Sequence, residues 1–89
     1  MYNFTKEELI DAITKIENQH DLLNFSSKYN STKISIEKPC LICDINCFVD
    51  GEESYIGISI SDDCELGFDI WIGDHEYFVN DESQLEKLN

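Results

Sequence analysis

The apolar residues of this chain recur at two different spacings, and the change comes near residue 33. Before that point they follow the repeat of an α-helix, with one apolar stripe made of Leu9, Ala12, Ile13 and Ile16. Thr5 and Glu8 stand ahead of this stripe as a Thr-x-x-Glu capping box, which marks a helix start. The apolar pattern weakens over 17–21 and resumes over 22–29, which fits either one bent helix or a second short one.

From residue 33 onward, apolar and polar residues alternate, which is the two-residue repeat of a β-strand. The alternation runs through residues 33–38, 41–49, 55–61, 65–72 and 75–80. Asp50-Gly51 and Gly73-Asp74 are turn sequences between neighbouring runs, and Pro39 interrupts the first strand. Consecutive strands joined by short turns predict an antiparallel meander.

One face of this sheet is continuously apolar and has to be covered, and the N-terminal helical stripe is the available cover. The sequence therefore predicts an α+β fold in one domain, residues 1–89, with an N-terminal helix packed on a four- to five-stranded antiparallel meander sheet. A short C-terminal helix is also predicted, with Asp81 as its cap and Gln84 in the capping-box position. Leu85 and Leu88 would then face inward.

Three of the four cysteines lie in the segment CLICDINC, residues 40–47. Strand alternation points Cys43 and Cys47 to the core and Cys40 to the other face. A zinc knuckle needs its Cys-x-x-Cys pair on a tight turn, and this segment contains no glycine. We therefore expect buried cysteines acting as small apolar residues, a partly exposed thiol at Cys64, and no bound metal or cofactor. A zinc site built from Cys40, Cys43, Cys64 and a histidine is the alternative.

The net charge of −13 is unevenly distributed, and the chain contains no arginine. Residues 1–38 carry six acids and five lysines, a net of −1, whereas residues 39–89 carry thirteen acids and one lysine, a net of −12. Nucleic-acid binding requires basic residues that neutralise phosphates, so direct binding to nucleic acid is excluded and anionic membranes are disfavoured. The expected partner is a protein with a basic surface.

No catalytic motif accompanies this charge. The sequence lacks a nucleophile elbow, a P-loop, a zinc-protease helix and a dinucleotide-binding glycine pattern. A Cys64–His75 nucleophile pair is the alternative to the expectation that the protein is not an enzyme. The N-terminal MYNFTKEELI lacks the features of a signal peptide, so a cytoplasmic location with reduced cysteines is expected.

The candidate binding residues lie on the outer face of the predicted sheet. Since Ile70 and Ile72 point inward, Trp71 points outward, and alternation places Phe48 and Tyr55 on the same face. Large aromatic side chains among charges on an uncovered face are typical of interface anchors. The alternative is that the C-terminal segment or residues 26–32 fold over and bury them. The predicted partner-binding set is Asp44, Phe48, Asp50, Glu52, Glu53, Tyr55, Asp62, Asp63, Glu65, Asp69, Trp71, Asp74 and Glu76.

The density of this charge is comparable to that of a nucleic acid. An 89-residue domain is about 30 Å wide, so twelve net charges approach one per about 2.5 Å, against one per about 1.7 Å along duplex DNA. Solubility alone needs far less charge. Because self-repulsion of this size costs stability, a selected function is a reasonable explanation of it.

The small size, the charge and the acidic aromatic stretch FDIWIGDHEYF, residues 68–78, resemble the phage-encoded inhibitors of host defence, which include anti-CRISPR and DNA-mimic anti-restriction proteins. The chain is similar in outline to immunity proteins that neutralise bacterial nuclease toxins. Either resemblance implies a stoichiometric inhibitor, monomeric or homodimeric, that occupies the nucleic-acid-binding surface of a nuclease or its complex. A small zinc-binding module is the alternative from another class.

Overall fold

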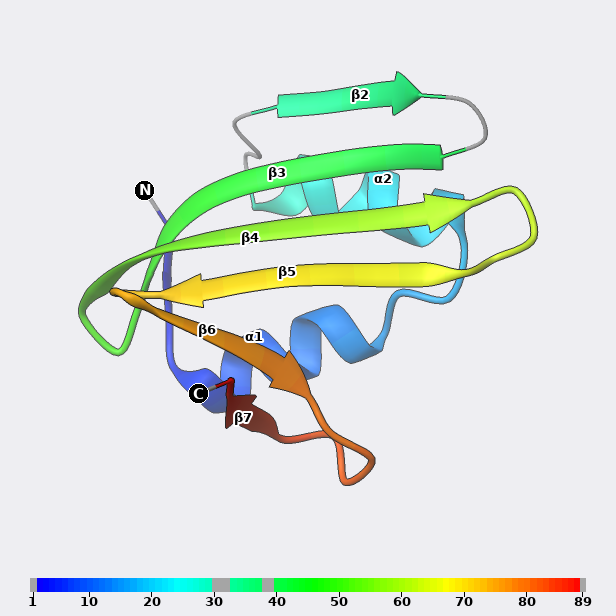
Figure 1. Cartoon of the computed structure of the whole chain (residues 1–89). Helices are drawn as coiled ribbons and strands as arrows, with labels where there is room; N and C mark the ends of the chain where they lie inside the picture. Colours follow the sequence, from blue (N-terminus) through cyan, green and yellow to red (C-terminus); the bar gives the residue numbers. More distant parts are fainter. Residues whose placement is uncertain (1, 30–32, 38–39, 89) are drawn as a thin grey trace.

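A computed structural model of the chain describes residues 2–29, 33–37 and 40–88. Within them lie two helices and seven strands, in the order β1 (Tyr2–Phe4), α1 (Lys6–Thr14), α2 (Gln19–Lys28), β2 (Lys33–Glu37), β3 (Cys40–Val49), β4 (Glu52–Ser61), β5 (Leu66–Ile72), β6 (His75–Val79) and β7 (Leu85–Lys87). The sheet forms one layer and the two helices form the other (Figure 1). The α+β class predicted from the sequence is therefore confirmed.

The strands form one sheet in the order β1-β3-β4-β5-β6-β7, and β2 pairs with the remaining part of the β3 edge. The run from β2 to β7 is antiparallel throughout, so the predicted meander is confirmed. Asp50 and Gly51, both at positive φ, make the tight β3–β4 turn that their sequence predicted. The strand count was too low, because β1 and β7 are three residues long and carry no alternation of their own.

The N-terminal half forms two helices rather than one bent helix. The Thr5 capping box is present, since the Glu8 N–H donates to Thr5 Oγ1 at 3.1 Å and the Thr5 N–H donates to Glu8 Oε1 at 2.9 Å. A second cap begins α2, where Asn18 Oδ1 accepts a hydrogen bond of 2.9 Å from the Asp21 N–H. The chain therefore turns between Lys15 and Asn18, and each helix packs separately on the sheet.

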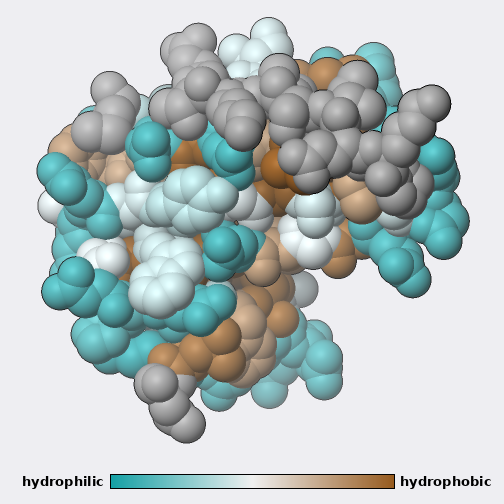
Figure 2. All heavy atoms as spheres, turned by 45° about the horizontal axis from the view of Figure 1, so that its top comes forward, coloured by the Kyte–Doolittle hydropathy of each residue, from teal (hydrophilic) through white to brown (hydrophobic). Residues whose placement is uncertain are grey.

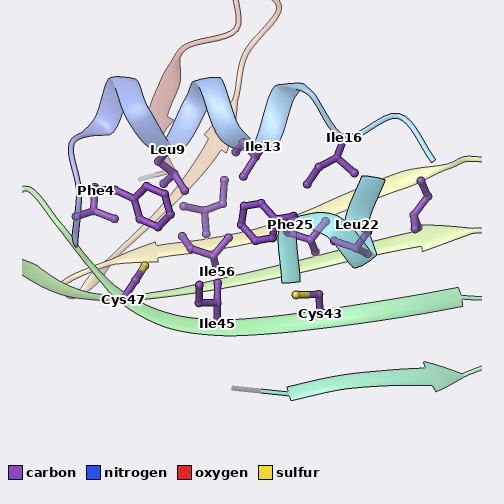
Figure 3. Packing of buried hydrophobic residues seen from close by; sticks show 14 of the residues in the cluster. Phe4, Leu9, Ile13, Ile16, Leu22, Phe25, Cys43, Ile45, Cys47 and Ile56 are labelled. Atoms are coloured by element: carbon purple, nitrogen blue, oxygen red, sulfur yellow. The ribbon is translucent and has the colours of Figure 1, made fainter. Parts of the chain in front are cut away.

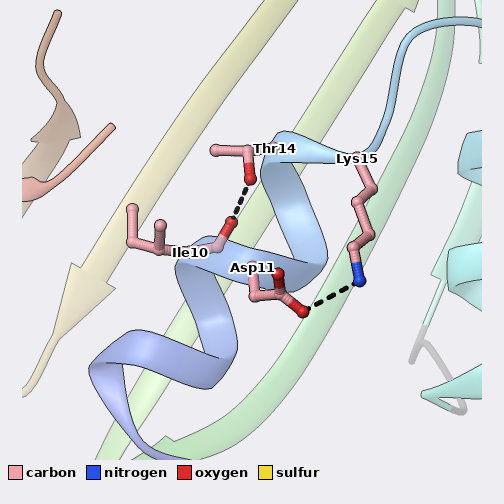
Figure 4. A network of polar contacts seen from close by, with 4 residues as sticks. All are labelled: Ile10, Asp11, Thr14 and Lys15. Carbon is pink, nitrogen blue, oxygen red and sulfur yellow. Dashed lines mark hydrogen bonds and ion pairs between the residues drawn. The ribbon is translucent and has the colours of Figure 1, made fainter. Parts of the chain in front are cut away.

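Two local side-chain contacts lie on the exposed side of α1 (Figure 4). Thr14 Oγ1 donates to the Ile10 carbonyl at 2.6 Å, and Lys15 Nζ pairs with Asp11 Oδ2 at 2.9 Å. Both charged side chains are more than 70% exposed, so solvent and salt screen this ion pair and it adds little stability.

The core lies between the helices and one face of the sheet (Figure 3). Leu9 and Ile13 of α1 and Leu22 and Phe25 of α2 are buried against the sheet. The sheet side of this core consists of Leu41, Cys43, Ile45, Cys47, Val49, Ile56, Ile58, Ile60, Ile70 and Ile72. These are the positions that strand alternation predicted to face inward, so Cys43 and Cys47 do act as core residues.

The predicted C-terminal helix is wrong. Residues 85–87 form β7, which pairs antiparallel with β6. The reason is Asn80, whose Oδ1 accepts hydrogen bonds from the N–H groups of Glu82 and Gln84 and whose own N–H donates to the Gln84 carbonyl. Ser83 at φ +56 completes a turn that sends the chain back along β6. Leu85 does pack against the core, whereas Leu88 is 43% exposed.

The molecule measures 32 × 28 × 20 Å with a radius of gyration of 12.2 Å, close to the size expected from chain length. Among the described residues, neither helix has the length and apolar character that crossing a membrane requires.

Candidate protein-binding surface

We use the name open face for the side of β3 to β6 that points away from both helices and toward the viewer in Figure 1. The strand register orders its residues into cross-strand rows. One row holds Asn46, Tyr55, Trp71 and Glu76, and the next holds Asp44, Gly57 and Asp69. A third row holds Ile42, Ser59 and Gly67. Aromatic and carboxylate side chains therefore stand in adjacent rows.

Both aromatic side chains of the first row lean toward the carboxylates of the second. Tyr55 Oη donates a hydrogen bond to Asp44 Oδ1 at 2.5 Å, and Trp71 Nε1 donates to Asp69 Oδ1 at 2.9 Å. Since β4 and β5 are antiparallel, position 57 on β4 and position 69 on β5 lie on the same side of the Tyr55–Trp71 pair. Each ring is thus held in one orientation by a hydrogen bond to a carboxylate.

Gly57 makes the orientation of Tyr55 sterically feasible. A Cβ atom at position 57 would lie 2.8 Å from Tyr55 Oη and 3.3 Å from two carbons of its ring. The tyrosine ring therefore lies over the backbone of Gly57, and its hydroxyl reaches Asp44 on the neighbouring strand. An isolated glycine in a strand often marks such a close approach, and this was the available sequence signal for a residue that the predicted set omitted.

The contact with Asp44 also changes the acidity of Tyr55. The hydrogen bond to Asp44, followed by partial burial and the negative charges of Asp44 and Asp69, raises the pKa of Tyr55 to about 12. The phenol thus remains a hydrogen-bond donor well above the pH at which an ordinary tyrosine ionises.

A shallow hollow of about 250 Å³ opens on this face over the two glycines, and we call it the central hollow. Its lining includes Ile42, Asp44, Tyr55, Gly57, Ser59 and Asp69. A side chain at Gly67 would also narrow it, because a Cβ there would lie 2.7 Å from Ser59 Oγ. In the surface view of this side, large side chains of intermediate hydropathy (pale) lie among hydrophilic ones (teal) (Figure 2).

The predicted set is split between the open face and the two ends of the sheet. By register and alternation the open face carries Asp44, Phe48, Glu53, Tyr55, Asp69, Trp71 and Glu76. Asp50, Glu52 and Asp74 lie at one end, in or beside the β3–β4 and β5–β6 turns, and there the Gly73 N–H donates to the Glu53 carbonyl at 2.9 Å. At the opposite end, the β4–β5 turn carries Asp62, Asp63 and Glu65.

The acids of the β4–β5 turn have structural contacts. Ser61 Oγ donates a hydrogen bond to Asp63, and Gln19 Nε2 of α2 donates to Asp62 Oδ1 at 3.3 Å. The Glu65 N–H donates to Ser61 Oγ at 3.0 Å. Their negative charge contributes to the field of the molecule, but these contacts tie Asp62 and Asp63 to the turn.

The aromatic side chains of the open face differ in exposure. Trp71 is 38% exposed, and Tyr55 and Phe48 are half-buried. Phe78, which the predicted set omitted, shares a face with Glu76 by alternation on β6 and is 37% exposed. The C-terminal segment pairs at the edge of the sheet as β7, so it does not fold over Trp71.

The cysteines take the places that alternation predicted. Cys43 and Cys47 are fully buried, and burial raises the pKa of the Cys47 thiol to about 11. Cys64 is exposed in the β4–β5 turn at φ +64. Across residues 2–29, 33–37 and 40–88, no group of three or more histidine, cysteine or acidic side chains is arranged to hold a metal ion.

Comparison of the chain with protein-family models, with curated proteins and with solved structures finds no match.

Proposed function

We propose that this protein is a small acidic inhibitor that binds a basic surface of a nucleic-acid-processing enzyme and so blocks the enzyme's nucleic-acid substrate. One observation carries the proposal. The open face presents two aromatic side chains, Tyr55 and Trp71, each fixed in orientation by an acidic neighbour. The segment that supplies this face, residues 39–86, contains no lysine or arginine.

The distribution of charge between the two layers supports this choice of face. Residues 5–28, which include both helices, carry five acids and three lysines, a net of −2. Residues 40–88, which form β3 to β7, carry thirteen acids and one lysine, a net of −12. Over the longest dimension of 32 Å this corresponds to about one charge per 2.7 Å, compared with about 1.7 Å in duplex DNA. A basic groove shaped for nucleic acid would attract this side of the molecule.

Charge and aromatic anchors have separate roles in this proposal. Exposed carboxylates steer the encounter with a basic partner and raise the association rate. Aromatic side chains at the centre of an interface slow dissociation. Since Tyr55 and Trp71 are oriented before binding, less conformational freedom is lost when the complex forms.

Titration of an enzyme's activity tests the proposal. The partner is isolated by affinity capture with the tagged protein, and its nuclease or nucleic-acid-binding activity is measured with increasing amounts of inhibitor. We expect complete loss of activity at one inhibitor per partner, and Trp71→Ala should need a higher concentration. Full activity at saturating inhibitor would rule the proposal out. The captured target also separates a phage defence inhibitor from a toxin immunity protein, since both use the same surface chemistry.

A further inference from the structure

We propose that the central hollow receives an arginine side chain of the partner, with the guanidinium held between Asp44 and Asp69 and against the ring of Tyr55. This inference rests on the proposed function, because it names the group through which a basic partner is anchored. It concerns one subsite, however, and it can be tested without the partner.

The hollow has the shape of a subsite for a single side chain. Its floor is glycine backbone at positions 57 and 67, and side chains at either position would collide with Tyr55 or Ser59. Its volume of about 250 Å³ lies just below the range of roughly 300–1,000 Å³ that is typical of small-molecule sites, which suits the head of one side chain. Ile42 and the Tyr55 ring give it apolar and aromatic walls.

The chemistry of the walls selects a planar cation. Asp44 and Asp69 stand at the two ends of one row, with Gly57 between them, so their Cα atoms are about 9.6 Å apart at two strand spacings. Asp44 and Asp69 each accept a hydrogen bond from an aromatic neighbour among their contacts, and the two oxygens of a carboxylate can accept several donors. A guanidinium presents five donors in one plane and stacks on aromatic rings, whereas an ammonium is a compact point charge.

The Asp69 side is the better approach for this cation, because Asp69 is exposed whereas Asp44 is only partly exposed. Asp69 lies between Gly67 and Trp71 on β5 and is exposed, within a segment that has no basic residue. An incoming arginine would therefore pair first with Asp69.

Trp71 supplies a direct reporter, because it is the sole tryptophan and its indole N–H is bonded to Asp69. The probe is the peptide acetyl-Gly-Arg-Gly-amide, titrated into the intact protein while Trp71 fluorescence and the amide signals of Gly57 and Gly67 are recorded. The same peptide with citrulline in place of arginine has nearly the same shape and no charge. The lysine peptide has the charge and no planar head.

We expect saturable changes at Trp71, Gly57 and Gly67 with the arginine peptide, weaker binding of the lysine peptide and none of the citrulline peptide. Asp69→Asn should weaken arginine binding by about tenfold or more, since it removes a charged acceptor and leaves an amide oxygen for the indole. Gly57→Ala should weaken arginine binding to a similar degree, because the new methyl group displaces Tyr55 although the charge is unchanged. Asp74→Asn removes the same charge as Asp69→Asn from the end of the sheet, and it should leave arginine binding within about twofold.

Equal effects of Asp69→Asn and Asp74→Asn, with none from Gly57→Ala, would overturn the inference, because binding would then follow the overall charge. Unsaturable shifts or equal binding of the citrulline peptide would also overturn it. Inhibition of the partner enzyme is measured separately. If a variant no longer binds the arginine peptide but still inhibits the partner enzyme, this inference alone is rejected. If the unmodified protein binds the arginine peptide but does not inhibit the enzyme, the proposed function is rejected.

Discussion

The ring of Tyr55 lies directly over Gly57, so close that a methyl group at position 57 would stand 2.8 Å from the tyrosine hydroxyl. This single approach allows the hydroxyl to reach Asp44 across the sheet, at 2.5 Å. The orientation of an aromatic side chain on the open face thus depends on the absence of a side chain elsewhere on the same strand.

Tyr55 should ionise with a raised pKa of about 12. Gly57→Ala should push the ring away from Asp44 and bring this pKa back toward the ordinary value of about 10. A spectrophotometric titration of the phenols, with Tyr55→Phe identifying the signal, checks both values. A Tyr55 midpoint near 10 in the unmodified protein would show that the hydrogen bond does not form.

The same shift gives a dependence of stability on pH. The folded-state pKa of Tyr55 is raised above its unfolded value, so the protonated phenol is favoured in the folded protein. The stability that this hydrogen-bonded phenol contributes to the folded protein is fully present below a pH of about 10, and it is lost as the pH rises through about 12. Urea midpoints should therefore fall more steeply over this interval in the unmodified protein than in Tyr55→Phe.

Thr5→Ala should lower the free energy of unfolding by about 1 kcal/mol, because the Glu8 N–H loses its acceptor at the start of α1. Thr14→Ala is the matched control, since Thr14 bonds back to the Ile10 carbonyl within the same helix and alanine has the higher helix propensity. Chemical denaturation measures both. Equal midpoints for Thr5→Ala and the unmodified protein would place the helix start elsewhere.

Cys47→Ser should destabilise the fold by about 1–3 kcal/mol, since it places a hydroxyl at a fully buried position on the core face of β3. Cys64→Ser in the exposed turn should be nearly neutral.

In the native protein an alkylating reagent should modify Cys64 first, because burial keeps the Cys47 thiol protonated and inaccessible. Elemental analysis of protein purified without added metal should show no zinc, and one zinc per chain would contradict this account of the cysteines.

For the complex with the partner enzyme, Trp71→Ala should cost about 2 kcal/mol or more of binding free energy, mainly through faster dissociation. Asp74→Lys should instead slow association, and raised salt should do the same, since exposed charges are screened within about 8–10 Å. Asp69 is less suitable for a charge reversal, because its carboxylate also holds the Trp71 indole. Surface plasmon resonance at two salt concentrations separates the two rates. A Trp71→Ala complex that dissociates at the unmodified rate would remove Trp71 from the interface.

Much of the fold could be predicted because its signals are local. Strand alternation identified the two faces of β3, β4 and β5, and the Thr5–Glu8 capping box located the start of α1. The closing strand β7 could not be predicted, because Asp81 and Gln84 fit a helix start equally well. The backbone there follows the side chain of Asn80, whose hydrogen bonds to Glu82 and Gln84 favour a turn.

The membership of the open face was predictable in part, but its arrangement was not. Alternation placed Tyr55, Trp71 and Asp69 on one face, and the register confirms that they share it. The direction in which each ring leans depends on hydrogen bonds to Asp44 and Asp69 and on a bare backbone at Gly57. Those contacts join positions two residues apart on one strand or on different strands, so strand alternation does not report them, and the isolated glycine at position 57 is the local signal that the sequence offers.

The central claim, that this protein occupies the site of a nucleic acid on its partner, is tested most directly by competition. The partner enzyme is held at fixed concentration with its labelled nucleic acid, and the bound nucleic acid is measured by fluorescence anisotropy as the inhibitor is added. We expect mutual exclusion: bound nucleic acid falls to zero, and a higher nucleic-acid concentration shifts the inhibitor midpoint upward in proportion. A ternary complex in which both remain bound without mutual loss of affinity would contradict it and would place inhibition at a remote surface.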